Sequence, residues 1–95
     1  MERLLRLVIL TPKGAFDPIV CDDVCLVAAD DAEGLGGGSV GIRFGHIPAL
    51  IALRENSPVT AYLNGKTVFN GRVTKGVAEV ASNVVTVIAE GAGSV

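Results

Sequence analysis

Hydrophobic and polar residues alternate in short segments along most of the chain. Residues 3–11 are largely apolar at both odd and even positions, as in a strand that is covered on both faces or held in an interface. Pro12 and Gly14 end this segment, because proline removes a backbone donor and glycine allows a left-handed turn. Further strands are expected at Val24–Ala29, Val40–Phe44 and Ala49–Leu53. The alternative for the last of these is a short helix over residues 48–54.

The clearest local pattern is a β-hairpin over Val59–Phe69. Asn64-Gly65 separates two β-prone runs and supplies the positive φ angles that a type I′ turn requires. A second hairpin is expected from Val77–Ala81 and Val84–Ala89, with its turn at Ser82-Asn83. Short strands separated by turn residues, without a long amphipathic run, predict an all-β sandwich or barrel.

Composition is that of one small domain with a hydrophobic core. Of the 95 residues, 49% are hydrophobic and 19% are charged, which excludes wholesale disorder. The net charge is −2 and the cations form no run, so the charge pattern argues against nucleic-acid binding. The apolar run Leu7–Leu10 is far shorter than the ~20 residues that span a bilayer, and the N-terminal residues contain no signal-peptide core. We expect a single intracellular domain over residues 1–95.

The two cysteines, Cys21 and Cys25, do not form a disulfide if they lie on one strand. Their Cα atoms would then be about 13 Å apart, and only a turn at Asp22-Asp23 would bring them together. Two buried free thiols in a reducing compartment are therefore expected. A metal site would need more ligands at recognisable spacing, and His46 is the only histidine.

The glycine-rich stretch Gly34–Gly45 raises the question of a phosphate-binding loop. A P-loop needs a lysine followed by serine or threonine, whereas Gly38 is followed by Ser39 and Val40. A dinucleotide fingerprint needs a helix next, and Val40 begins an expected strand. The nearby acids lack the EF-hand spacing, and His46 lacks a partner at catalytic spacing. We expect no catalytic residue, no cofactor site and no metal site.

Three segments resemble one protein family. Residues 40–50, VGIRFGHIPAL, resemble the Gly-Glu-Leu-Gly-Ile-(Tyr/Leu)-Pro-Gly-His-Ala-Pro-Leu-Leu signature of the epsilon subunit of F-type ATP synthases, which corresponds to the mitochondrial delta subunit. Residues 5–12, LRLVILTP, look like the opening strand of that family. Residues 76–90, GVAEVASNVVTVIAE, look like its closing hairpin. The segments follow the family order and span nearly the whole chain.

The chain departs from the family pattern at several places. Ser39 stands where the family has a glutamate, and Phe44 stands where it has the proline before Gly-His. The loop between Val27 and Gly41 is longer than usual. We also expect no C-terminal helical hairpin, the part that carries ATP binding and inhibition in the family.

The resemblance implies a flattened β-sandwich of two mainly antiparallel sheets with about ten short strands. It implies a non-catalytic central-stalk (rotor) subunit that docks on the gamma subunit and the c-ring and couples ion-driven rotation to ATP synthesis or hydrolysis. The implied location is the cytoplasmic face of the bacterial inner membrane, with membrane association only through the complex. The c-ring docking residues carried over by resemblance are Ser39, Gly41, Arg43, Phe44, Gly45 and His46.

Several expectations about this segment follow. Ser39, Arg43, Phe44 and His46 should lie exposed and close together at one end of the sandwich, although Phe44 could instead turn into the core. Gly41 and Gly45 either allow close backbone approach or are plain turn glycines. The Asp30–Gly38 loop is expected to be mobile, because it has little apolar area to offset its ordering. The alternative function is a stand-alone small-molecule- or metal-binding β-sandwich that uses Cys21, Cys25, His46 and the acidic loop.

Overall fold

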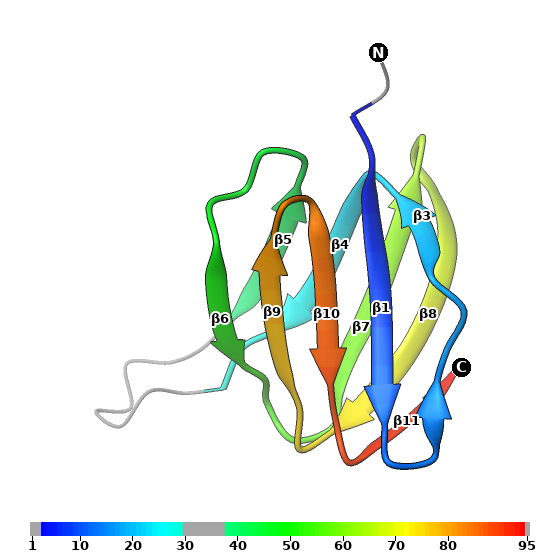
Figure 1. Ribbon diagram of the computed structural model, residues 1–95, viewed down its shortest axis with the longest axis vertical. Helices are drawn as coiled ribbons and strands as arrows, with labels where there is room; N and C mark the ends of the chain where they lie inside the picture. Colours follow the sequence, from blue (N-terminus) through cyan, green and yellow to red (C-terminus); the bar gives the residue numbers. More distant parts are fainter. Residues whose placement is uncertain (1–2, 30–37, 95) are drawn as a thin grey trace.

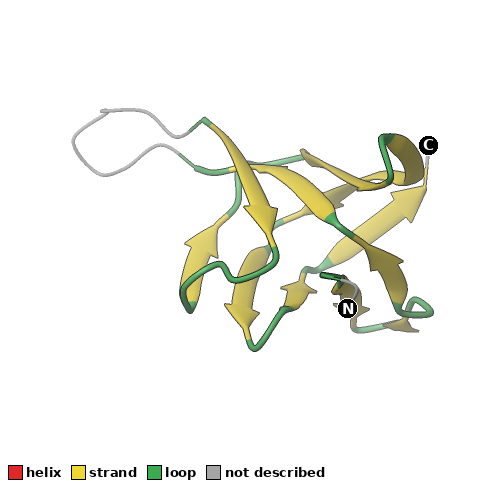
Figure 2. Ribbon diagram, turned by 90° about the horizontal axis from the view of Figure 1, so that it is seen from above, coloured by secondary structure: helices red, strands yellow, loops and turns green. Residues whose placement is uncertain are grey.

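The computed structural model describes residues 3–29 and 38–94 (Figure 1). These residues form eleven strands and no helix, arranged as two packed sheets (Figure 2). The first sheet contains β1 (Leu5–Thr11), β2 (Gly14–Ala15), β3 (Ile19–Cys21), β6 (Ala49–Ala52), β9 (Val77–Ala81) and β10 (Val84–Ile88). The second contains β4 (Asp23–Val27), β5 (Ser39–Arg43), β7 (Ser57–Leu63), β8 (Lys66–Thr74) and β11 (Gly91–Ser94). The predicted all-β sandwich is confirmed.

The strand order brings distant parts of the sequence together. The first sheet has the order β2-β1-β10-β9-β6, with β3 also paired to β1, and the second has the order β11-β8-β7-β4-β5. Neighbouring strands are antiparallel except for β1 and β10, which are parallel. The N-terminal strand is thus held beside the hairpin near the C-terminal end.

Both predicted hairpins are confirmed. The β7–β8 turn has φ angles of 52° at Asn64 and 79° at Gly65, and the β9–β10 turn has 50° at Ser82 and 63° at Asn83. Two central residues with positive φ are what a type I′ turn requires, because this backbone matches the right-handed twist of the strands.

The structure also corrects some predicted elements. Residues 49–52 form strand β6, so the alternative of a short helix from residue 48 to 54 is wrong. β4 begins one residue earlier and ends two residues earlier than expected, and β5 begins and ends one residue earlier. Three short strands, β2, β3 and β11, were not predicted, because pieces of two to four residues carry almost no alternation.

The core is formed by the inward side chains of both sheets. Leu5, Leu7 and Ile9 of β1 are at most 1% exposed, and they pack with the buried valines and leucines of the other strands. The opposite face of β1 is only half-buried at Val8 and Leu10. The apolar pattern at both parities therefore marks one core face and one partly open outer face, rather than a strand covered on both sides within this chain.

Candidate docking site

Strand β5 carries the first part of the predicted docking segment, and it separates the predicted residues. It pairs with β4 so that Ser39 lies opposite Val27 and Arg43 lies opposite Asp23. Ser39 and Arg43 are therefore at the two ends of β5, about 13 Å apart at the usual strand rise. The expectation that Ser39 lies close to Arg43, Phe44 and His46 is therefore wrong, because Ser39 is at the opposite end of the strand from these residues.

Residues 44–48, which join β5 to β6, form an exposed loop that we call the docking loop. It lies at the upper end of Figure 1, the same end as the β7–β8 and β9–β10 turns. The His46 backbone N–H donates to the Arg43 carbonyl oxygen at 3.1 Å and closes a turn. Gly45 has a φ of 83° in this turn, a conformation that residues with a side chain rarely adopt.

Gly41 differs from Gly45. A Cβ atom built on Gly41 would meet only the Asp23 carboxylate, at 3.9 Å, which is an ordinary contact. Within the described residues, nothing at Gly41 requires a close backbone approach, whereas the φ of Gly45 does require glycine or a residue that tolerates the left-handed region.

His46 is half-buried, and its ring is oriented by its own loop. Its Nδ1 atom lies 2.7 Å from the Ile47 carbonyl oxygen. A carbonyl oxygen only accepts hydrogen bonds, so Nδ1 carries the proton in this contact.

Apolar side chains around the docking loop are unusually exposed. Phe44 is 42% exposed, Ile47 is 75% exposed and Leu50 of β6 is 73% exposed. Phe44 thus lies neither in the core nor fully in solvent. The exposure of Ile47 in the docking loop and of Leu50 in the edge strand β6 was not predicted, because composition alone does not distinguish an exposed apolar segment from a buried one. Pro48, which directly precedes β6, was the available signal, because proline within a sheet favours an edge strand.

Arg43 extends across the second sheet instead of toward the docking loop. Its guanidinium lies 3.5 Å from the Asp23 carboxylate, in an ion pair that leaves the arginine side chain 79% exposed. The Asp23 side chain is only 24% exposed, and its Oδ1 atom is buried without a hydrogen-bond partner among the described residues. Arg43 therefore neutralises a largely covered carboxylate, and moving its guanidinium to a partner would leave Asp23 without this ion pair.

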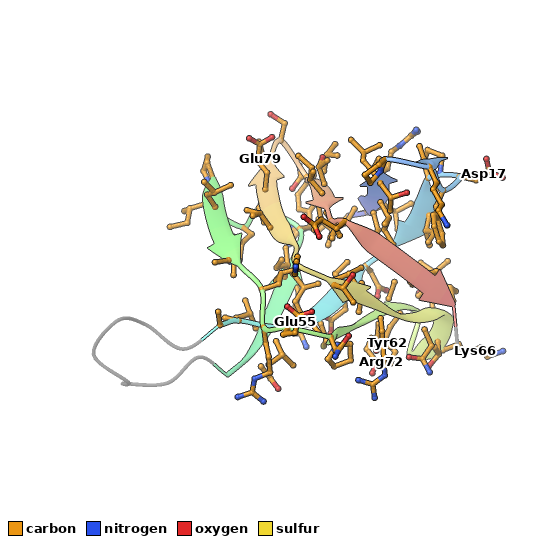
Figure 3. The ribbon with its side chains drawn as sticks, turned by 90° about the horizontal axis from the view of Figure 1, so that it is seen from below. Asp17, Glu55, Tyr62, Lys66, Arg72 and Glu79 are labelled. Carbon is orange, nitrogen blue, oxygen red and sulfur yellow. The ribbon has the colours of Figure 1, made fainter. Side chains whose placement is uncertain are left out.

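The outer face of the first sheet carries a second apolar surface. Ala52, Val77, Ile88 and Leu10 are paired at one register across β6, β9, β10 and β1, and we call them the apolar row. Ile88 is 55% exposed and Val77 is 38% exposed. A shallow groove of about 390 Å³ lies beside them. Glu79 of β9 projects from this outer face, on the opposite side of the sandwich from Tyr62 and Arg72 (Figure 3).

The two cysteines lie in different environments. Both are free, with Cys21 at the end of β3 in the core and Cys25 half-buried in β4. The expectation of two buried thiols is therefore wrong for Cys25, because it alternates with Val24 and Leu26, which take the inward positions of its strand. Burial raises the pKa of the Cys21 thiol to about 11, and it also raises the pKa of Cys25.

Three expectations from the sequence can be compared with the described residues alone. In the described residues, no group of three or more histidine, cysteine, aspartate or glutamate side chains is placed to hold a metal ion. No helix among them is long and apolar enough to cross a membrane. The predicted mobility of the Asp30–Gly38 loop concerns residues 30–37, which lie outside the described residues.

A small β-sandwich whose notable surface features are exposed apolar side chains on a loop and on one sheet is typical of an interaction domain. Comparison with protein families identifies which one. The family described as ATP synthase, Delta/Epsilon chain, beta-sandwich domain matches residues 4–95. The chain belongs to this family, so it is an ATP synthase subunit of the delta/epsilon type. A search of curated proteins found no match.

Proposed function

We propose that this chain is a non-catalytic central-stalk subunit of an F-type ATP synthase. It docks on the gamma subunit and on the c-ring, and it couples ion-driven rotation of the ring to ATP synthesis or hydrolysis. The observation that carries this proposal is the family match over residues 4–95, which covers the sandwich and both exposed apolar surfaces. As a rotor part, the chain is peripheral to the membrane, on the cytoplasmic face of the bacterial inner membrane.

The docking loop is the surface we assign to the c-ring. Phe44 and Ile47 are exposed beside the polar groups of Gly45 and His46, a mixture that suits contact with polar loops. Covering the exposed 42% of a phenylalanine of about 200 Å² would remove about 80 Å² from water. At about 25 cal/mol per Å² this corresponds to ~2 kcal/mol, or roughly 30-fold in affinity.

The apolar row is the surface we assign to the gamma subunit. Interfaces between permanent subunits are more apolar than transient ones, and the row extends over four adjacent strands. Its rim carries the exposed Lys75–Glu90 ion pair, whose charged atoms are 3.7 Å apart. Charges at the rim of an apolar patch guide association more than they add affinity.

The sandwich is suited to transmitting force between these two surfaces. Strand β6 contributes Leu50 near the docking loop and Ala52 to the apolar row, so one strand joins both. From β6, hydrogen-bonded ladders continue through β9 and β10 to β1, over a tightly packed core. Such interiors have low compressibility, and a load applied at one surface is therefore passed to the other.

Binding of the purified chain to the gamma subunit and to the c-ring from the same source tests the proposal. Phe44→Ala is compared with Val68→Ala, because Val68 has a matching exposure of 43% and its strand β8 lies three strands from β5 in the second sheet. We expect Phe44→Ala to weaken ring binding and Val68→Ala to leave it unchanged, while both lower the melting temperature modestly, because more than half of each side chain is already covered. A large fall in melting temperature for Phe44→Ala would instead assign this ring to the core. Failure of the wild-type chain to bind either partner would overturn the proposal.

A further inference from the structure

Asn83, in the β9–β10 turn, connects the docking loop to the body of the sandwich. The Gly45 backbone N–H donates to the Asn83 Oδ1 atom at 2.9 Å, across 38 positions of the sequence. The backbone carbonyl oxygen of Asn83 also accepts from the Arg6 N–H, at 3.1 Å. One residue therefore joins the docking loop, the β9–β10 turn and strand β1.

The other hydrogen bonds that the docking loop makes within the described residues are local. The His46 N–H bonds to the Arg43 carbonyl, and the His46 ring bonds to the Ile47 carbonyl. In the part of the chain that the structure describes, the Asn83 side chain supplies the hydrogen bond that joins this loop to another element. The local bonds set the shape of the turn, and the bond to Asn83 sets its orientation relative to the sheets.

The turn geometry explains why asparagine suits this position. Asn83 has a φ of 63°, which asparagine, aspartate and glycine tolerate better than other residues. Glycine would satisfy this backbone requirement but would supply no acceptor to Gly45. Aspartate would satisfy both requirements. The two roles of Asn83 can therefore be separated by substitution.

We propose that Asn83 is a positioning residue for docking. Its side-chain carbonyl holds the Gly45 peptide, and through it the exposed Phe44 and Ile47, in the arrangement that a partner meets. A loop that is already ordered loses less conformational entropy on binding. This inference rests on the proposed function, because the loop must be a docking surface for its order to affect affinity.

The first test examines the loop in the isolated chain by NMR. Asn83→Gly removes the acceptor and keeps the backbone, Asn83→Asp keeps both, and Ser82→Gly changes the neighbouring turn residue as a control. In Asn83→Gly we expect the Gly45 amide proton to shift upfield and the heteronuclear Overhauser effects of residues 44–47 to fall. Asn83→Asp and Ser82→Gly should retain the wild-type values. An unchanged loop in Asn83→Gly would overturn the inference.

The second test measures binding of the same variants to the isolated c-ring and to the gamma subunit. Asn83→Gly should weaken ring binding by about 3- to 10-fold, the range that one net hydrogen bond corresponds to, and Asn83→Asp should recover most of it. All three variants should melt close to the wild-type temperature. Equal ring affinity for Asn83→Gly and wild type would refute the positioning role. If the wild type binds neither subunit while the NMR result holds, the proposed function fails and the structural role of Asn83 stands.

Discussion

Among the described glycines, Gly71 of β8 has the least room for a side chain. A Cβ atom there would lie 2.6 Å from the Gly93 carbonyl oxygen in β11 and 2.8 Å from the Phe69 ring. The Phe69 ring packs edge-on against Phe16, with centroids 6.1 Å apart and an angle of 82° between the rings. Gly71→Ala must therefore move the edge strand β11, the aromatic pair, or both.

The size of the effect follows from these contacts. Overpacking costs about 1–3 kcal/mol, and disturbing an aromatic pair costs roughly 0.5–1.5 kcal/mol. Replacing glycine by alanine within a strand regains about 0.5–1 kcal/mol. We expect a net loss of about 2 kcal/mol in the free energy of unfolding, or roughly 8–16 °C in the melting temperature of a domain of this size.

Urea and thermal unfolding of Gly71→Ala measure this loss, with Gly93→Ala as the matched control. Gly93 lies in the neighbouring strand β11, and a Cβ atom there would meet nothing within 4 Å. Gly93→Ala should therefore leave the free energy of unfolding within about 0.5 kcal/mol of wild type. Equal stability of the two variants would refute the reasoning, because only their surroundings differ.

Other predictions concern a buried hydroxyl, a turn and a thiol. Ser57→Ala should lower the free energy of unfolding in urea by about 1–3 kcal/mol, because the fully buried Ser57 hydroxyl accepts from the Val27 N–H at 3.1 Å. An unchanged unfolding midpoint would mean that water takes the place of the hydroxyl as the acceptor for Val27. Gly65→Val should cost ~1 kcal/mol or more, since Gly65 has a φ of 79°; a wild-type melting temperature would contradict this. The pKa of Cys21 is raised to about 11, so the unfolded chain loses this proton first and stability should fall as the pH rises from about 9 to 11. Cys21→Ala should show a shallower fall, and an identical slope would exclude this thiol as the cause.

Much of the fold could be predicted from local pattern. The Asn64-Gly65 and Ser82-Asn83 turns were predictable because positive φ at two successive positions restricts the residue types strongly. The core face of β1 was not visible, because residues 3–11 are apolar at both odd and even positions. The pairing of β1 with β10 was not visible either, because a parallel contact between chain ends leaves no signal in either segment.

The candidate site was predictable as a segment but not as a surface. Resemblance indicated residues 39–46, yet strand geometry places Ser39 and Arg43 at opposite ends of β5. The exposed Ile47 and the Asn83 contact depend on how two distant turns meet in space. The local pattern of a single sequence does not indicate a contact between two turns that are far apart along the chain.

The most direct test of the central claim is coupled ion pumping by the assembled enzyme. Membrane vesicles carrying the ATP synthase of the same organism, depleted of its delta/epsilon chain, are supplied with the purified protein, and ATP-driven ion uptake is followed with proton- and sodium-sensitive dyes. We predict that the wild-type protein restores uptake of one of these ions, and that Phe44→Ala restores less than Val68→Ala. If the wild-type protein leaves uptake at the depleted level while ATP hydrolysis continues, it is not the coupling subunit of this rotor.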